Sequence, residues 1–163
     1  MFHSWGMKPD QTLSPDVRLR ARGARSNAAG RFEAYGVQYD AEAGEEEARL
    51  LRTQVTTERP RRVITYNRSP DLPFDRSINP YRGCEHGCIY CFARPSHAYL
   101  GLSPGLDFET RLIARPEAPA RLEAELRARS YGVAPMAIGT NTDPYQPIEA
   151  EFGITRACLE VLQ

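Results

Sequence analysis

Hydrophobic positions follow two different patterns along the chain, and the change falls near residue 62. Residues 1–39 show little periodicity and contain many glycines, prolines and arginines. After them, an acidic beginning and a basic end predict a helix over Asp40 to Gln54, because that arrangement complements the helix dipole. We therefore interpret residues 1–61 as a loop-rich, partly disordered arm with one short helix, and residues 62–163 as the folded core.

The core alternates between strand-like and helix-like patterns. Short β-branched or alternating runs predict strands over Val63–Tyr66, Ser77–Tyr81, Phe108–Ile113 and Ala134–Gly139. Apolar residues at helical spacing predict helices over Arg94–Leu100, Ala120–Tyr131 and Ile154–Gln163, with Thr155 as the cap of the last one. Strands that alternate with helices are typical of an α/β fold with parallel strands.

Composition narrows the cellular setting. The net charge is +0 over 163 residues, so the whole chain is not a polyelectrolyte suited to nucleic acid. No apolar run approaches the ~20 residues of a spanning helix, and the N-terminus lacks the apolar segment of a secretory signal. We expect a cytoplasmic protein without a membrane partner, in which cysteines serve as metal ligands or catalytic thiols.

The arm carries a cluster of arginines. They are Arg18, Arg20, Arg22, Arg25 and Arg31, with Asp16 as the acidic residue among them. A solvated arm is one interpretation. A basic segment that contacts an anionic substrate or nucleic acid is the other.

Three closely spaced cysteines are the clearest chemical signal. Cys84, Cys88 and Cys91 follow the pattern C-x3-C-x2-C, whereas Cys158 lies far downstream in a predicted helix. Iron–sulfur clusters are normally held by four cysteine thiolates, so three ligands leave one iron open for another molecule. We expect Cys158 to be a buried helix residue.

The residues around these cysteines resemble a known superfamily. The loop reads Cys-Glu-His-Gly-Cys-Ile-Tyr-Cys, with the aromatic Tyr90 directly before Cys91. With its flank from Asn79 to Glu109 and the segment from Gly139 to Glu149, it resembles the radical S-adenosylmethionine (radical SAM) superfamily. Within that superfamily, the likeness is to a bacterial subgroup related to spore photoproduct lyase-like proteins. It covers roughly Arg62 to Gln163.

The resemblance implies a fold, cofactors and a reaction. Cys84, Cys88 and Cys91 would ligate a [4Fe-4S] cluster, and S-adenosylmethionine would chelate the open iron. One electron, from a reductant such as flavodoxin or ferredoxin, would cleave the cofactor to a 5′-deoxyadenosyl radical. That radical would abstract hydrogen from an unknown substrate, for which nucleic acid is one class to consider. The fold would be the N-terminal portion of a partial (βα)6 barrel.

The resemblance also assigns cofactor contacts. Tyr90 would lie beside the adenine, and Thr140, Asn141, Thr142 and Asp143 would accept hydrogen bonds from the methionyl ammonium. The last segment departs from the Gly-Gly-Glu-like sequence of many members. Both motifs follow predicted strands, and sites in α/β folds lie at the carboxyl ends of strands.

Several alternatives stay open on the residues alone. The cysteines could form a zinc site completed by His86 or His97, which would make the chain a noncatalytic metal-binding module. Tyr90 could be a core residue, and Asp143 could cap a turn with Pro144. Arg94 could contact an anion or form a surface ion pair.

The C-terminal end of the sequence suggests a fragment. Residues 159–163 continue a helical pattern without a Gly or Pro stop, and two βα units cannot close a barrel. We therefore expect a C-terminally truncated portion of an enzyme that is inactive by itself, or else a nonfunctional truncated product. Substrate specificity and the later cofactor contacts would be encoded in the missing part.

Overall fold

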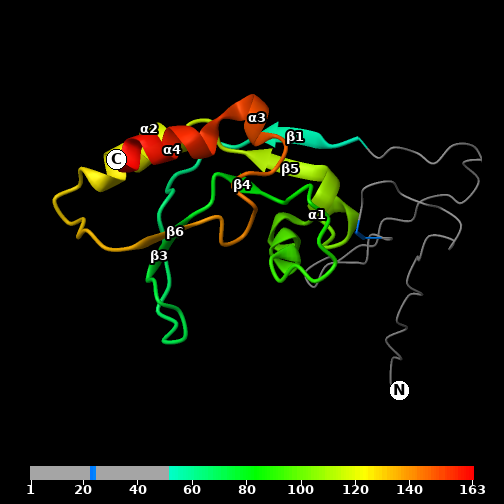
Figure 1. Cartoon of the computed structure of the whole chain (residues 1–163), viewed down its shortest axis with the longest axis horizontal. Coiled ribbons are helices and arrows are strands. Elements are labelled where there is room, and N and C mark those ends of the chain that lie inside the picture. The colour runs from blue at the N-terminus through cyan, green and yellow to red at the C-terminus, as the bar shows by residue number, and fades with distance from the viewer. Residues whose placement is uncertain (1–22, 25–51) are drawn as a thin grey trace, which may run out of the picture.

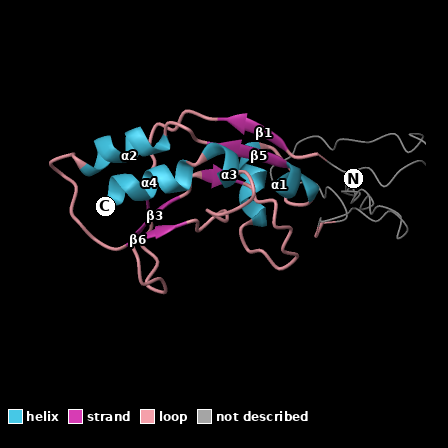
Figure 2. Ribbon diagram, turned by 45° about the horizontal axis from the view of Figure 1, so that its top comes forward, coloured by secondary structure: helices cyan, strands magenta, loops and turns pink. Residues whose placement is uncertain are grey.

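The structure is a computed structural model that describes residues 23–24 and 52–163 of the chain. Four strands come first in the described core, and helices then alternate with the two remaining strands, as Figures 1 and 2 show. The strands are β1 (Gln54–Thr57), β2 (Thr65–Tyr66), β3 (Arg76–Ile78), β4 (Tyr81–Arg82), β5 (Arg111–Ala114) and β6 (Met136–Ile138). The helices are the 3-10 helix η1 (Arg94–Leu100) and the α-helices α1 (Leu106–Thr110), α2 (Ala118–Leu126), α3 (Glu149–Phe152) and α4 (Ile154–Leu162).

The strands form two small sheets of mixed direction. One has the order β1-β5-β4, with β1 parallel and β4 antiparallel to β5. The other has the order β2-β3-β6, with β6 parallel and β2 antiparallel to β3. The described residues are thus mixed α/β and contain no closed barrel, and the partial (βα)6 barrel stays a prediction.

A corner at Asn79 and Pro80 passes the chain from one sheet to the other. β3 ends at Ile78 in the second sheet, and β4 begins at Tyr81 in the first. The single strand that we predicted over Ser77–Tyr81 is therefore wrong in its continuity. Proline has no N–H for a strand ladder, which favours a break at this position.

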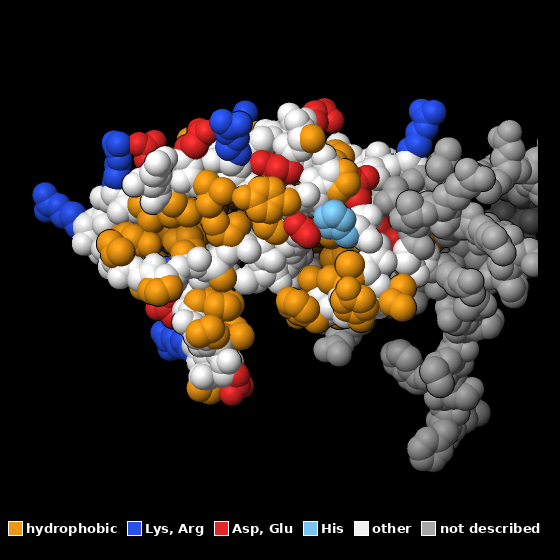
Figure 3. Space-filling model, viewed as in Figure 1, with side chains coloured by type: hydrophobic (Ala, Val, Ile, Leu, Met, Phe, Trp, Pro, Cys, Tyr) orange, Lys and Arg blue, Asp and Glu red, His pale blue; other side chains and the backbone are white. Residues whose placement is uncertain are grey.

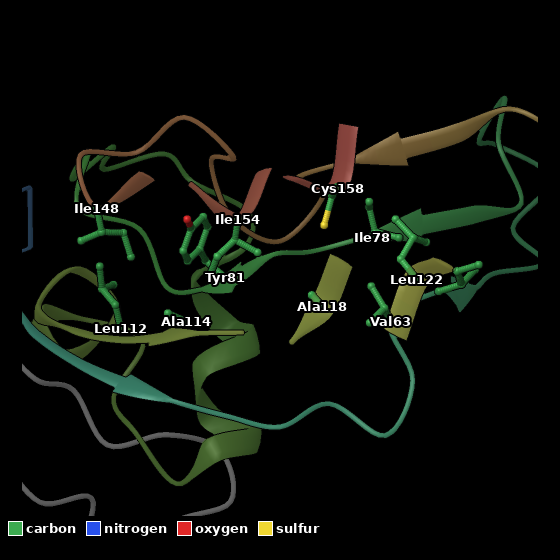
Figure 4. Packing of buried hydrophobic residues seen from close by; sticks show 11 residues of the cluster. Val63, Ile78, Tyr81, Leu112, Ala114, Ala118, Leu122, Ile148, Ile154 and Cys158 are labelled. Atoms are coloured by element: carbon green, nitrogen blue, oxygen red, sulfur yellow. The ribbon is translucent and has the colours of Figure 1, made fainter. Parts of the chain in front are cut away.

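The main core lies between the sheets and the helices α2 and α4, which run side by side in Figures 1 and 2. Figure 4 shows its buried side chains converging from both sheets, with Tyr81 and Ile154 near the centre and the sulfur of Cys158 among them. Ile78, Tyr81, Leu112 and Leu122 are fully buried. Burying side chains of this size contributes about 1.5–3 kcal/mol each.

The predicted elements match the structure unevenly. η1 occupies the predicted Arg94–Leu100, α2 begins two residues before the predicted Ala120, and α4 matches the last helix closely. The strand predicted over Phe108–Ile113 is wrong in its first half, because residues 106–110 form α1 and β5 begins at Arg111. The helix predicted over Asp40–Gln54 lies almost wholly outside the described residues, and Gln54 itself begins β1.

Thr155 does not cap α4 as predicted. Gly153, in a left-handed conformation with φ of 61°, takes the cap position. The hydroxyl of Thr155 instead donates to the Pro144 carbonyl at 2.7 Å. Among the described residues, no helix is long and apolar enough to cross a membrane.

Candidate functional site

The two motifs that carry the resemblance meet where β3 and β6 end. These strands are parallel, and their last paired residues are Ile78 and Ile138. Just beyond them, the Asn79 amide donates to the Thr140 hydroxyl at 3.2 Å, and the Asn141 N–H donates to the Asn79 carbonyl oxygen Oδ1 at 2.8 Å. The prediction that both motifs follow strands is confirmed, although the cysteine loop directly follows β4 of the first sheet and the segment Thr140–Asp143 follows β6 of the second.

Cys84 is held at both of its peptide bonds by the segment after β6. The Thr142 hydroxyl donates to the Gly83 carbonyl at 2.7 Å, and Gln146 Nε2 donates to the same oxygen at 3.3 Å. Gln146 Oε1 accepts from the Glu85 N–H at 3.2 Å, and Nε2 also donates to Thr142 Oγ1 at 3.0 Å. Thr142 and Gln146 are buried, so the cysteine loop and this segment form one polar junction.

Gly83 makes that junction sterically feasible. Its φ of 77° lies in the left-handed region, which favours glycine. A Cβ there would lie 2.7 Å from the Leu112 Cδ2 atom and 2.8 Å from the Phe108 carbonyl oxygen. The Cys84 N–H donates to that same carbonyl at 2.9 Å, so the loop base lies directly against the end of α1.

The three thiols of the loop differ in exposure, and all are free of disulfides. Cys84 is buried, and this burial raises the pKa of its thiol. Cys88 and Cys91 are half-buried, and Cys91 packs with Cys84 against Ala93 and Phe108. A raised pKa disfavours the free thiolate, and a positively charged ligand would stabilise the thiolate of Cys84.

Cys158 lies in a different environment. It is fully buried in the main core, and burial raises the pKa of its thiol to about 11. The prediction that Cys158 is a buried helix residue is confirmed.

Large hydrophobic side chains are exposed around the cysteines. Ile89, Tyr90 and Phe92 are 77%, 86% and 81% exposed. Figure 3 shows hydrophobic side chains gathered on this face beside α1, apart from the band over α4. The alternative that Tyr90 is a core residue is therefore wrong, whereas its contact with adenine stays a prediction.

The segment Thr140–Asp143 uses part of its polar atoms within the protein. Thr142 is committed to the loop junction, and Asp143 Oδ1 accepts from the Tyr145 N–H at 2.8 Å, which confirms the turn-capping alternative. Asp143 Oδ2 lies 3.4 Å from His86 Nε2. The Asn141 side chain is exposed. Binding of S-adenosylmethionine by Thr140, Asn141, Thr142 and Asp143 stays a prediction.

The two histidines do not join the thiols. His86 is exposed on the loop, and His97 is fully buried, with Nε2 3.0 Å from the Arg111 carbonyl oxygen. Burial lowers the pKa of His97, so it is neutral near pH 7 and donates from Nε2. It packs edge-on against Phe108, as a core residue does.

The three thiols are the kind of ligand that an iron–sulfur cluster needs, but their side chains are not arranged around one metal position. Three free thiols lie on one loop, and two of them share an apolar cluster. Within residues 23–24 and 52–163, however, no group of three or more His, Cys, Asp or Glu side chains is placed to hold a metal ion. The identity of the donors is therefore what supports a metal here.

Sequence reasoning did not find the roles of two residues of this site. Gln146 has no signal of its own beyond its place in the second motif, yet it binds the peptide groups on both sides of Cys84. Arg94 is neither a surface ion pair nor free to contact an anion. Its Nε and Nη2 donate to the Cys88 carbonyl at 3.0 and 2.9 Å, and its side chain is only 12% exposed.

Comparison with known proteins gives relatives without a stated activity. No family model matches the chain, and no solved structure matches it. Uncharacterized proteins of Mycobacterium tuberculosis, among them Rv2578c, and of Mycobacterium bovis are 48% identical to it over 83 residues, which is 51% of this chain. The chain spans about a quarter of the length of these curated relatives, since the match covers 24% of each.

Proposed function

We propose that this chain supplies the cluster-binding loop of a radical SAM enzyme, with Cys84, Cys88 and Cys91 as iron ligands. The observation that carries the proposal is the junction around Cys84. Gln146 and Thr142 join the cysteine loop to the segment after β6. These are the two motifs on which the resemblance rests. Their residues are in contact in the structure although they lie far apart in the sequence; Glu85 and Gln146, for example, are 61 positions apart.

The residues of the chain would divide the work of the site. Thr142 and Gln146 fix the position of Cys84 through the peptide groups on either side of it. The half-buried Cys88 and Cys91 are accessible to an incoming cluster. The exposed Asn141 belongs to the segment proposed to bind the cofactor's methionyl group. When bound, the [4Fe-4S] cluster and S-adenosylmethionine would supply reductive cleavage to a 5′-deoxyadenosyl radical.

The exposed side chains around the loop support a partner surface. Ile89, Tyr90 and Phe92 project from the loop that holds the thiols, and aromatic side chains of this kind are typical of ligand and protein contacts. We propose that Tyr90 contacts the adenine. A cytoplasmic flavodoxin or ferredoxin would provide the electron, and nucleic acid is the substrate class that the resemblance suggests for the whole enzyme.

Anaerobic reconstitution with iron and sulfide tests the proposal. Cys84→Ala, Cys88→Ala and Cys91→Ala should each lose bound iron and sulfide, whereas Cys158→Ala, in the separate core, should retain them. S-adenosylmethionine added to the reduced, loaded wild type should change its electron paramagnetic resonance spectrum, because new ligands at one iron alter its electronic environment.

Two outcomes would contradict the proposal. An unchanged spectrum with an intact cluster would favour a noncatalytic iron–sulfur module. Binding of zinc in place of an iron–sulfur cluster, with loss on substitution of His86, would favour the zinc module.

A further inference from the structure

A largely buried guanidinium, that of Arg94, holds the middle of the cysteine loop. Arg94 donates from Nε and Nη2 to the Cys88 carbonyl, and from Nη1 to the carbonyls of Pro104 and Gly105 at 3.4 and 3.2 Å. Its Nη2 also pairs with Glu109, and its guanidinium lies 5.4 Å from the centre of the Phe108 ring. These contacts employ all five N–H groups of the arginine.

The Cys88 carbonyl is consequently fixed from several directions. Besides the two donors of Arg94, it accepts from the Cys91 N–H at 3.2 Å. A planar, forked donor is suited to this, because its rigid geometry lets two N–H groups hold one carbonyl while the guanidinium pairs with a carboxylate, whereas lysine is a point charge with rotating donors. The orientation of the peptide after Cys88 relative to Cys91 is thereby set.

Glu109 extends the same network to the N-terminal arm. Its side chain is fully buried, and besides pairing with Arg94 it accepts from the N–H groups of Gly23 and Ala24 at 3.0 and 2.8 Å. These residues lie 86 and 85 positions away in the sequence. The described piece of the arm thus lies on the cysteine loop.

Gly23 approaches the loop so closely that a side chain would not fit. A Cβ on Gly23 would lie 1.7 Å from the Gly87 carbonyl oxygen and 3.1 Å from the Ile89 Cγ2 atom. Gly87 and Ile89 flank Cys88, so the arm covers the same turn that Arg94 holds.

A buried ion pair is a costly way to gain stability. Its desolvation penalty often cancels its attraction, and well-packed apolar residues can replace such a pair without loss. The contribution of the Arg94–Glu109 pair is to fix the orientation of the groups that it binds. It links the arm, Glu109, Arg94 and the Cys88 carbonyl in one hydrogen-bonded series.

We propose that Arg94 and Glu109 are positioning residues for the Cys88–Cys91 half of the loop, and that Gly23–Ala24 is a strap clamped over it. The significance for metal binding rests on the function proposed above. The clamp itself can be tested without any metal.

Thiol labelling of the cluster-free 163-residue chain provides the first test. Arg94→Met/Glu109→Leu should keep a melting temperature near that of the wild type. Iodoacetamide should nevertheless alkylate Cys88 and Cys91 about tenfold faster, the scale expected when one hydrogen bond to a charged group is lost. Gly23→Ala should also speed the labelling of Cys88, whereas Gly132→Ala should not, because a Cβ on Gly132 meets no atom within 4 Å.

The outcomes separate the clamp from the proposed function. Wild-type labelling rates in both the double variant and Gly23→Ala would overturn the clamp. If these variants are labelled faster but the wild type takes up no iron and sulfide, the result would support the clamp and count against the radical SAM proposal. If the wild type does take up a cluster, the double variant should lose it severalfold faster to a chelator, and equal loss would overturn the positioning role.

Discussion

The junction beside Cys84 makes a quantitative prediction for Thr142. Thr142→Val keeps the shape of the side chain but removes its hydroxyl. Two hydrogen bonds disappear, the donation to the Gly83 carbonyl at 2.7 Å and the acceptance from Gln146 Nε2 at 3.0 Å. Each buried hydrogen bond contributes about 1 kcal/mol, so the free energy of unfolding of the variant should be about 2 kcal/mol lower than that of the wild type.

Two features of the site bound this estimate. The Gly83 carbonyl keeps a second donor in Gln146, so it is not left unpaired, which limits the loss. Thr142 is only 6% exposed, so water cannot replace the hydroxyl. For a chain of this size, about 2 kcal/mol corresponds to a fall in melting temperature of roughly 4–8 °C.

Urea denaturation and thermal melting measure the effect, and Thr142→Ser is the matched control. Serine keeps the hydroxyl and loses a methyl group, so it should lose about half as much free energy or less. Because the junction holds the loop base, Thr142→Val should also make Cys84 more reactive toward iodoacetamide. A valine variant as stable as the wild type, or a serine variant equally destabilised, would refute the role of the hydroxyl.

Two further predictions concern single residues. Glu149 accepts from Tyr81 Oη and from the N–H groups of Thr155 and Arg156; burial alone would raise its pKa, but these hydrogen bonds outweigh that and lower it. A carboxylate whose pKa is lowered by folding contributes stability at pH values above its ordinary pKa of 4.5, and this stability is lost as pH falls through its pKa in the folded protein. The loss of unfolding free energy caused by Glu149→Gln should therefore become smaller as the pH is lowered below 4.5. A loss that does not depend on pH would contradict this. Gly83→Ala should lose about 1–3 kcal/mol through backbone strain, with a further cost from its contact with the Phe108 carbonyl, and Gly132→Ala should be neutral in the same melts; equal melting temperatures would contradict it.

Local patterns predicted the parts of the fold that depend on local forces. Val63 to Tyr66 and Ala134 to Gly139 have the β-branched or apolar composition of strands, and the structure places β2 and β6 there. Gly101 ends η1 in a left-handed conformation at the predicted position. The position of each motif after a strand was also predicted, but the cysteine loop follows β4 of the first sheet and Thr140–Asp143 follows β6 of the second, which local patterns do not show.

Long-range pairing decided what the patterns could not show. β1 is a mostly exposed strand whose partner, β5, lies far along the chain. Phe108 alternates with its neighbours as a strand residue would, but it lies in α1 and packs under Arg94 and His97. Local sequence likewise carries no sign that Glu109 binds the backbone of the arm.

The sheet-to-sheet corner has a practical consequence for protein engineering. Residues 76–78 pair in the second sheet, residues 81–82 pair in the first, and Thr142 and Gln146 bind the Gly83 carbonyl that follows. An inserted residue in this stretch would shift the two pairing registers relative to each other. His86 is exposed and lies outside every strand and helix. A designer who wishes to change the spacing of the thiols, for example to accept a different metal, should therefore lengthen the chain beside His86 and leave unaltered both the corner and Gly87, against which Gly23 packs.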